Sequence, residues 1–212
     1  MKRAIFHSAF AHGVGAAVTL LTTLLVLSSV PAGAQDVQFN RDGSLKQPQG
    51  YREWVYIGTP LTPNDMNGGK ASFPEFHSVY INPRAWAAYK KTGEFPDGTV
   101  LIKELIGVGS KKATSGNGYF MGEFVGLEAA IKDKKRFADA PGHWAYYSFG
   151  HEYPLSAAAS PRKFEECSSC HQTNAAQDYV FTQYYPVVRT ADPGKARSNA
   201  PAAGSGMAAR SK

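Results

Sequence analysis

Two apolar segments in the middle of the chain decide the fold: Thr99-Val100-Leu101-Ile102-Lys103-Glu104-Leu105-Ile106-Gly107-Val108 and Gly118-Tyr119-Phe120-Met121-Gly122-Glu123-Phe124-Val125-Gly126-Leu127-Glu128-Ala129-Ala130-Ile131. Both are rich in the aliphatic, β-branched and aromatic residues that strands favour. The segment between them is rich in Gly, Ser and Lys, which is typical of a turn. The pattern therefore predicts a long antiparallel hairpin.

Charged residues interrupt both predicted strands. Because side chains alternate between the two faces of a strand, Lys103 and Glu104 must lie on opposite faces. The same alternation predicts that Phe120, Phe124 and Glu128 share one face. A carboxyl group among aromatic side chains would have a raised pKa and could accept a proton near neutral pH. The alternative is that Lys103 and Glu128 are paired or snorkelling groups at a sheet edge, which the pattern alone favours.

Shorter segments extend this sheet and add helices to it. The residue patterns predict strands within residues 51–58, 76–81 and 143–150. Asn82 is a candidate N-cap and Pro83 suits the first helical position, so residues 84–92 are predicted to form a short helix that ends before Gly93. The fold class is therefore α+β, with a large antiparallel β-sheet and a few packed helices.

The segment Cys167-Ser168-Ser169-Cys170-His171 contains both cysteines of the chain. C-x-x-C-H is the attachment signature of c-type haem, in which Cys167 and Cys170 form thioethers and His171 ligates the iron. A zinc site would need further Cys or His ligands at paired spacing, and the chain has no other cysteine. A thioredoxin-like pair would open a helix after a strand, whereas residues 161–166 already begin a helical segment. We therefore predict one haem c per chain, on a C-terminal helical segment.

Residues 1–34 have the three parts of a secretory signal peptide. Lys2 and Arg3 precede an apolar stretch, and the small residues Pro31-Ala32-Gly33-Ala34 suggest cleavage near Ala34. The apolar stretch is short and contains threonines, so it fits a signal better than a membrane span. Haem c is attached outside the bacterial cytoplasm, so the signal and the C-x-x-C-H motif independently predict the periplasm. Residues 35–189 would then form one haem-binding domain.

The positive charge lies mostly at the two ends of the chain. The formal net charge falls from +6 to +4 without residues 1–34, and residues 190–212 carry +3 of that remainder, which leaves about +1 on the domain. Residues 190–212 are rich in Ala, Gly, Ser and Pro, which predicts a disordered tail. Nucleic-acid binding is therefore not predicted.

The position of the motif argues against an ordinary electron carrier. Small class I c-type cytochromes are mostly helical and carry the C-x-x-C-H near the mature N-terminus, with a methionine after it as the sixth ligand. Here the motif comes late, and Met207 in the predicted tail is the only methionine after it. Met66 or Met121 could still be a sixth ligand, but core or turn positions explain both more simply.

Several segments resemble the cytochrome P-460 family, and the likeness runs from about Phe39 to Arg189. They are Gly50-Tyr51-Arg52-Glu53-Trp54-Val55, Lys91-Thr92-Gly93-Glu94-Phe95, Asp97-Gly98-Thr99-Val100, Ser115-Gly116-Asn117-Gly118-Tyr119-Phe120-Met121-Gly122, and Glu166-Cys167-Ser168-Ser169-Cys170-His171 followed by Val180-Phe181-Thr182. The resemblance implies a periplasmic homodimer with a large antiparallel sheet. It also implies an open haem site that binds nitric oxide and oxidises hydroxylamine to nitric oxide or nitrous oxide, with a periplasmic cytochrome as electron acceptor.

The resemblance also implies roles for individual residues. The family's T-V-x-x-K-E-L context matches Lys103, which would be covalently joined to a meso carbon of the porphyrin, and its G-L-E context matches Glu128, the carboxylate that would take protons from the substrate. Where the family has a distal arginine, this chain has His77, which ordinarily titrates near neutral pH. His77 would lie beside the bound ligand and make its hydrogen bonding pH-dependent, or it would act as a sixth iron ligand.

Two alternatives to a hydroxylamine oxidoreductase stay open from the sequence. One is a cytochrome c′-beta, a relative with the same fold that binds nitric oxide without the cross-link or turnover. The other is a six-coordinate electron-transfer cytochrome. The presence of both Lys103 and Glu128 favours the enzyme.

Overall fold

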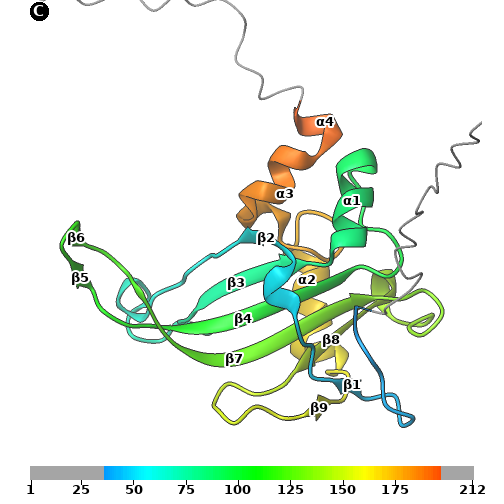
Figure 1. The fold of residues 1–212 in the computed structure, drawn as a ribbon, viewed down its shortest axis with the longest axis horizontal. Coiled ribbons are helices and arrows are strands. Elements are labelled where there is room, and N and C mark those ends of the chain that lie inside the picture. The colour runs from blue at the N-terminus through cyan, green and yellow to red at the C-terminus, as the bar shows by residue number, and fades with distance from the viewer. Residues whose placement is uncertain (1–35, 197–212) are drawn as a thin grey trace, which may run out of the picture. The chain divides into compact units, whose positions relative to one another are not determined.

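The computed structural model describes residues 36–196. Its centre is a five-stranded antiparallel sheet with the strand order β2-β3-β4-β7-β8 (Figure 1). The strands are β2 Val55–Gly58, β3 Phe76–Ile81, β4 Val100–Val108, β7 Met121–Lys132 and β8 Trp144–Ser148. The antiparallel sheet and the central hairpin are confirmed, with β4 and β7 as its two longest strands.

Two small strand pairs and several short helices complete the domain. The strand β1 Leu45–Lys46 pairs with β9 Ala158–Ala159, and β5 Lys112–Ala113 pairs with β6 Gly116–Asn117 at the tip of the central hairpin. The helices are α1 Pro83–Thr92, a π-helical turn Phe164–Ser168, α2 Ser169–Asn174, α3 Pro186–Ala191 and α4 Pro193–Ala196. Single 3₁₀ turns occur at Tyr51–Glu53, Asn64–Asn67, Pro141–His143 and Thr182–Tyr184.

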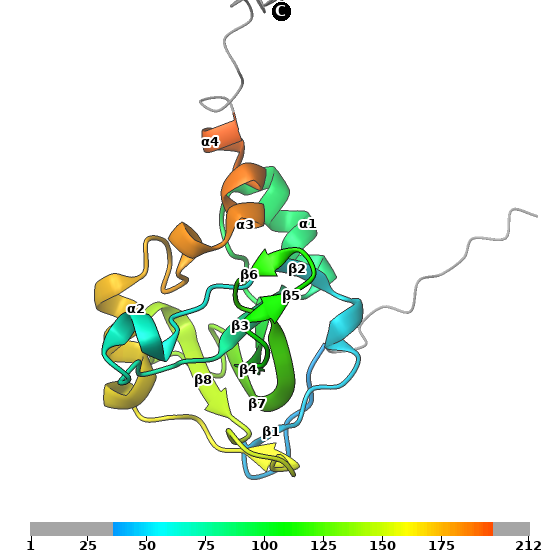
Figure 2. The ribbon, with the colours of Figure 1, turned by 90° about the vertical axis from the view of Figure 1, so that its left-hand side faces the viewer.

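The alternation of side chains along β4 divides the core into two layers. On one face, Leu101 packs with residues of α1 and α3 such as Tyr89 and Val188, and Cys167 lies against this layer. On the other face, Val100 and Ile102 pack against Leu45 of β1 and other residues of the N-terminal segment. Figure 2 shows α2 and the β1 segment on opposite sides of the sheet. We call the first layer the helix face, and it carries Lys103.

A β-bulge in β7 overturns one part of the predicted pattern. Leu105 pairs with Gly126, but the next residue of β4, Ile106, pairs with Phe124, so Val125 is an extra residue in β7. A bulge reverses the alternation of side chains beyond it. Phe124 therefore lies on the face of Glu104, where its ring contacts the Arg52 guanidinium at 4.5 Å. The prediction that Phe124 and Glu128 share a face was wrong.

Asn82 begins α1 as predicted, but its side chain has a different role from an N-cap. The backbone carbonyl of Asn82 accepts from the Trp86 amide, while the fully buried side chain reaches toward β4 instead. Its Oδ1 accepts from the Val100 amide at 2.9 Å, and its Nδ2 donates to the Gly98 carbonyl at 3.2 Å. Asn82 therefore ties the start of the helix to the start of β4.

No helix within residues 36–196 is long and apolar enough to cross a membrane. The predicted signal peptide, residues 1–34, lies outside the described residues, as does most of the predicted tail, residues 197–212. The signal peptide and a tail over residues 197–212 stay predictions. The predicted start of the disordered tail at residue 190 was wrong, because residues 190 and 191 end α3 and Pro193–Ala196 form α4.

Replacing Asn82 with alanine should lower the free energy of unfolding by about 1–3 kcal/mol, because the buried Val100 amide would lose its acceptor. Urea unfolding followed by circular dichroism measures this change. Asn67→Ala is the control, because Asn67 is exposed and bonds only a nearby carbonyl. Equal losses in the two variants would contradict the assigned role of Asn82.

Candidate functional site

The two cysteines lie on a short helical segment at the helix face. The π-helical turn Phe164–Ser168 continues directly into α2, so the segment is helical as predicted. Both thiols are free; Cys167 is partly buried and Cys170 is exposed. Residues three and four positions apart share one side of a helix, which puts Cys167, Cys170 and His171 on the same side. Burial raises the pKa of the Cys167 thiol.

His171 is oriented as an iron ligand would be. Its Nδ1 donates to the Tyr179 carbonyl at 2.7 Å, which fixes the tautomer and leaves Nε2 with a free lone pair. The ring packs against Tyr146 and Phe181, at centroid distances of 4.3 and 4.6 Å. Burial lowers the pKa of His171, which favours the neutral form that binds metals. This donor set, with two free thiols beside it, fits a c-type haem.

The Tyr179 carbonyl is itself held in place by neighbouring side chains. Asp178 and Tyr179 have left-handed backbone angles, with φ of 45° and 62°. The Asp178 carboxylate accepts from Lys132 Nζ at 2.6 Å and from Trp144 Nε1 at 3.3 Å. The Tyr146 hydroxyl donates to the same Tyr179 carbonyl at 3.2 Å. The acceptor for His171 is therefore fixed by strands β7 and β8.

Lys103 and Glu128 face each other across the central strand pair. They are direct partners in the register of β4 and β7, and Lys103 Nζ lies 2.5 Å from Glu128 Oε2. Lys103 Nζ also lies 5.1 Å from the centre of the Phe73 ring. The other carboxylate oxygen, Glu128 Oε1, lies 3.0 Å from Nε2 of His151. Glu128 is thus held between an amine and an imidazole.

The expected raised pKa of Glu128 was wrong in direction. Burial raises the pKa of this carboxyl, but the charge of Lys103 and the hydrogen bonds from Lys103 and His151 outweigh burial and lower it. The pKa is lowered instead of raised because the neighbours of Glu128 differ from the predicted ones. The bulge turns Phe124 to the opposite face, and the register places the charged Lys103 directly opposite Glu128. Glu128 is therefore ionised at neutral pH as long as Lys103 carries no covalent bond to another group.

His77 lies on the same face as Lys103, because it pairs with Leu105 in the register of β3 and β4. Its side chain is mostly buried, with 15% exposed, and its buried Nε2 has no hydrogen-bond partner within residues 36–196. The nearest carboxylate oxygen, Glu75 Oε2, is 4.0 Å away and also buried without a partner. Burial lowers the pKa of His77 to about 4. The expected titration near neutral pH is therefore wrong, and the ring stays neutral with an unused polar atom.

The predicted residues lie near one another at the helix face. Burial is the main cause of the pKa shifts of His77, Cys167 and His171, and the charges of both Lys103 and Glu128 contribute to all three shifts. Cys167 packs against the layer that contains Leu101, two residues before Lys103 in β4, so the helical segment lies against the sheet face that carries Lys103 and Glu128. The unpartnered nitrogen of His77 is consistent with a ligand that completes its hydrogen bonding.

Sequence reasoning missed His151 and the residues around His171. His151 follows β8 in an irregular loop, where no periodicity marks it, although the preceding Gly150 is a turn signal. Of the two candidate methionine ligands, Met66 is 75% exposed in the turn Asn64–Asn67, and Met121 is 52% exposed at the start of β7. The turn interpretation of Met66 is confirmed, and neither methionine is part of the core.

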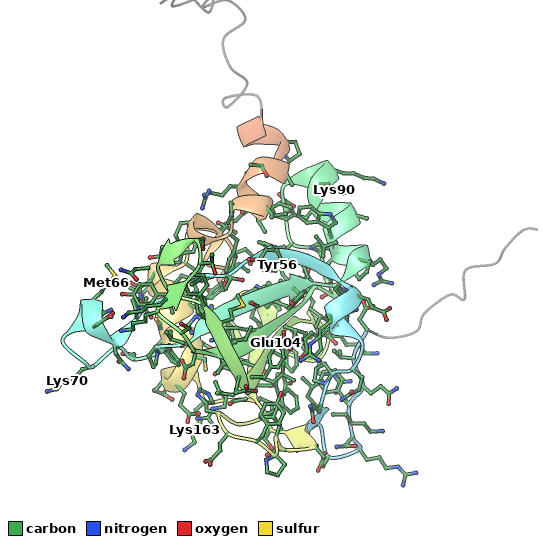
Figure 3. The ribbon with its side chains drawn as sticks, turned by 60° about the vertical axis from the view of Figure 1, so that its left-hand side comes forward. Tyr56, Met66, Lys70, Lys90, Glu104 and Lys163 are labelled. Atoms are coloured by element: carbon green, nitrogen blue, oxygen red, sulfur yellow. The ribbon has the colours of Figure 1, made fainter. Side chains whose placement is uncertain are left out.

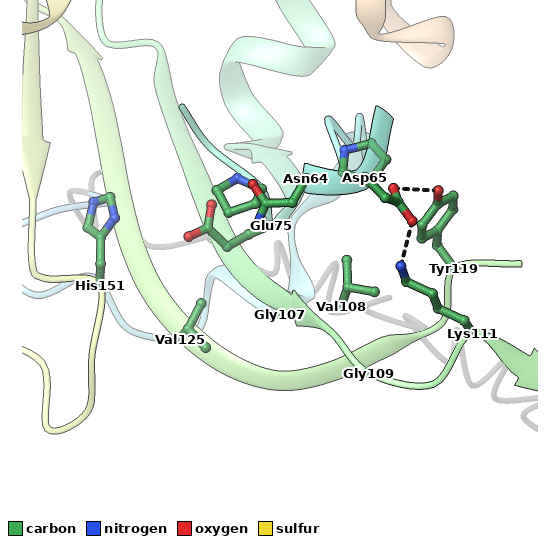
Figure 4. Close-up of a pocket in the computed structure, with 12 residues that line it drawn as sticks. Asn64, Asp65, Glu75, Gly107, Val108, Gly109, Lys111, Tyr119, Val125 and His151 are labelled. Carbon is green, nitrogen blue, oxygen red and sulfur yellow. Dashed lines mark hydrogen bonds and ion pairs between the residues drawn. The ribbon is translucent and has the colours of Figure 1, made fainter. Parts of the chain in front are cut away.

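An open cavity of about 450 Å³ adjoins this site (Figure 4). His151 and Glu75 line one end of it. At the other end, Asp65 accepts from the Tyr119 hydroxyl at 2.8 Å and from Lys111 Nζ at 2.5 Å. This contact joins the turn Asn64–Asn67 to the arm of the central hairpin. The cavity therefore connects the neighbourhood of Glu128 with the surface.

A family model described as Cytochrome P460 matches residues 48–182. The chain belongs to the cytochrome P460 family. The match includes β2 to β8, the C-x-x-C-H motif, Lys103, Glu128 and His77. Membership makes a c-type haem the expected group at Cys167, Cys170 and His171, in agreement with the donor set of the site.

A second likeness is partial. An endochitinase of Manduca sexta is 30% identical to this chain over 121 residues, which cover 50% of this chain and 22% of that protein. The chain thus spans about a fifth of the length of this relative. A match of that extent does not identify an activity.

The buried His77 should make the protein less stable in mild acid. The pKa of His77 is lowered to about 4 in the folded state, so the unfolded state binds more protons between pH 6.5 and 4. Stability is fully present above pH 6.5 and should fall by about 2 kcal/mol between pH 7 and pH 5 because of this group. In His77→Gln that part of the loss should disappear.

Urea unfolding of both proteins at the two pH values measures the difference. His143→Gln is the matched control, because His143 is a partly exposed histidine outside this site, directly before the first residue of β8. An identical pH dependence in wild type and His77→Gln would contradict a buried neutral His77.

Proposed function

We propose that this protein is a haem-dependent hydroxylamine oxidoreductase. Cys167 and Cys170 would tether the haem, His171 would ligate its iron, and Lys103 would form a further covalent bond to the porphyrin edge. Bound haem supplies an iron that coordinates the substrate nitrogen and takes up its electrons. The observation that carries the proposal is the direct pairing of Lys103 with Glu128 on the face that bears the C-x-x-C-H segment.

Glu128 is the proposed proton acceptor. Oxidation of hydroxylamine to nitric oxide releases three protons and three electrons, so a base must act repeatedly at the substrate. The carboxylate is ionised and mostly buried, with 22% of its side chain exposed, which strengthens its interaction with nearby protons. His77, with a neutral ring and an unpartnered Nε2, would hydrogen-bond the bound ligand beside it.

The covalent bond at Lys103 would also tune Glu128. Forming a carbon–nitrogen bond removes one hydrogen from Nζ and one from the porphyrin edge, so it needs a two-electron oxidant such as peroxide. Glu128 Oε2 is 2.5 Å from Nζ and would accept its proton. Once the amine has lost its positive charge, the main influence that lowers the pKa of Glu128 is gone, and burial acts without it to raise that pKa. The cross-link would thus convert Glu128 into a stronger base.

The remaining parts of the proposal follow the family. Nitric oxide would be released, or a second hydroxylamine would react to give nitrous oxide. A periplasmic cytochrome would accept the electrons, and the enzyme would be an exported homodimer. Anaerobic incubation with hydroxylamine and a chemical oxidant, with detection of both gases, tests the activity directly.

Replacing Glu128 with glutamine should slow hydroxylamine oxidation by about 10²-fold or more, because the amide has no basic oxygen for the substrate protons. The visible spectrum of the haem should stay intact. Turnover is measured in the anaerobic assay, with Glu123→Gln as control because Glu123 is exposed on the same strand. Unchanged turnover in Glu128→Gln would remove this residue from its proposed role.

The cross-link should be visible by mass spectrometry after denaturation and digestion. We expect one species that joins the haem-bearing Cys167–Cys170 peptide to the peptide containing Lys103, with two hydrogens fewer than the sum of its parts. In Lys103→Arg the two peptides should separate. A free Lys103 in the wild-type digest would instead favour a cytochrome c′-beta type of protein that binds nitric oxide without turnover.

A further inference from the structure

We infer that His151 carries protons from Glu128 to the solvent during turnover. This inference rests on the proposed function, since a proton path matters only if the site releases protons. Glu128 has two oxygens with separate partners: Oε2 contacts Lys103 Nζ at 2.5 Å, and Oε1 contacts His151 Nε2 at 3.0 Å. One oxygen of the Glu128 carboxylate therefore faces the Lys103 amine, and the other faces the His151 imidazole.

A glycine in β7 lets His151 reach this position. A Cβ atom on Gly126 would lie 2.7 Å from the Gly150 carbonyl oxygen, 2.8 Å from Leu105 Cδ1 and 3.1 Å from His151 Cα. Only a residue without a side chain lets the loop after β8 approach β7 this closely. The Leu127 amide donates to the same Gly150 carbonyl at 3.2 Å. Glu128 lies two residues after Gly126 in β7. The close approach at Gly126 therefore places His151 beside Glu128.

His151 is the group that connects Glu128 with water. Of the Glu128 side chain 22% is exposed, whereas 44% of the His151 side chain is exposed. His151 lines the open cavity and Glu128 is not among its lining residues (Figure 4). An imidazole can take a proton at one nitrogen and release another from the second nitrogen. His151 has both the chemistry and the position of a relay.

The step is balanced and involves no electrons. In the His151 tautomer with its proton on Nδ1, a proton taken up by Glu128 moves from Oε1 to Nε2, and the Nδ1 proton leaves to water in the cavity. The carboxylate is then ionised again, and proton exchange between His151 and cavity water restores the Nδ1–H tautomer before the next proton. Electrons from hydroxylamine leave separately, to the external oxidant through the haem. One proton leaves for each cycle of the relay.

Other groups around His151 do not provide this path. Lys103 faces the opposite oxygen of Glu128 and is the proposed site of the covalent bond. His77 lies on the same face as Lys103, but its Nε2 is buried. Glu75 lines the same end of the cavity, and its Oε2 is also buried. His151 is the exposed member of this group.

The test compares His151→Gln with His151→Ala in the haem-loaded protein. Glutamine can still donate a hydrogen bond to Glu128 but cannot pass a proton on. We expect kcat for hydroxylamine to fall about tenfold or more in both variants with KM unchanged. Imidazole added to the solvent should restore kcat in His151→Ala and not in His151→Gln. His143→Gln is the control, because it removes a histidine outside the site.

Two measurements separate proton transfer from a structural effect. The haem spectrum and the affinity for nitric oxide need no proton transfer and should be unchanged in His151→Gln. In ¹⁵N NMR of labelled protein, the His151 Nε2 resonance of wild type should be shifted by its hydrogen bond to Glu128, and the shift should be lost in Glu128→Ala.

The outcomes are distinct. Full kcat in His151→Gln, or a loss in His151→Ala that imidazole does not restore, would overturn the relay while leaving the proposed activity in place. A wild-type protein that does not oxidise hydroxylamine would overturn the proposed function, and the relay with it.

Discussion

The register between β4 and β7 is the constraint on which the rest of the site depends. Side chains directly opposite each other in an antiparallel pair share a face at short distance, so this register alone puts Lys103 against Glu128. A shift by one residue would send one of them to the opposite face. The bulge at Val125 directly precedes Gly126 in β7 and lies between the Lys103–Glu128 pair and the turn of the hairpin. It leaves the Lys103 pairing intact while turning Phe124 away.

The two glutamates of this strand pair show how environment separates structural from reactive roles. Glu104 is almost fully buried on the other face (Figure 3), where its Oε1 accepts from the Tyr51 hydroxyl at 2.7 Å and from Arg52 Nε at 2.8 Å. Both donors are structural side chains, and together they occupy Oε1 of Glu104, so this oxygen is not available to exchange protons. Glu128 is held by an amine with its own proposed chemistry and by an exposed imidazole. The same side chain is therefore a structural anchor on one face and a candidate base on the other.

The sequence allowed prediction of the regular parts of the structure and of the donor set. The strands β3 and β4, the helix after Asn82 and the C-x-x-C-H segment all follow from periodicity, caps and spacing, which are local properties. The environment of Glu128 could not be predicted from the sequence because it depends on a bulge. An extra residue in the pairing of two strands does not change the residue pattern of either strand alone. His151 was missed for a similar reason, since a close approach between Gly126 and the following loop is a tertiary feature.

The candidate site combines residues on the central strands with His171 on the short helix α2, and the two parts are held in place in different ways. The β3, β4 and β7 strands position His77, Lys103 and Glu128 through continuous ladder hydrogen bonds, so these side chains have little freedom relative to one another. His171 comes from a helix of six residues, too short to be stable alone, and depends on Asp178, Lys132 and Trp144 to fix the carbonyl that orients its ring. Lys132 and Trp144 belong to β7 and β8. The same sheet that carries the proposed base therefore also sets the direction of the iron ligand, and β7 contributes to both sides of the site.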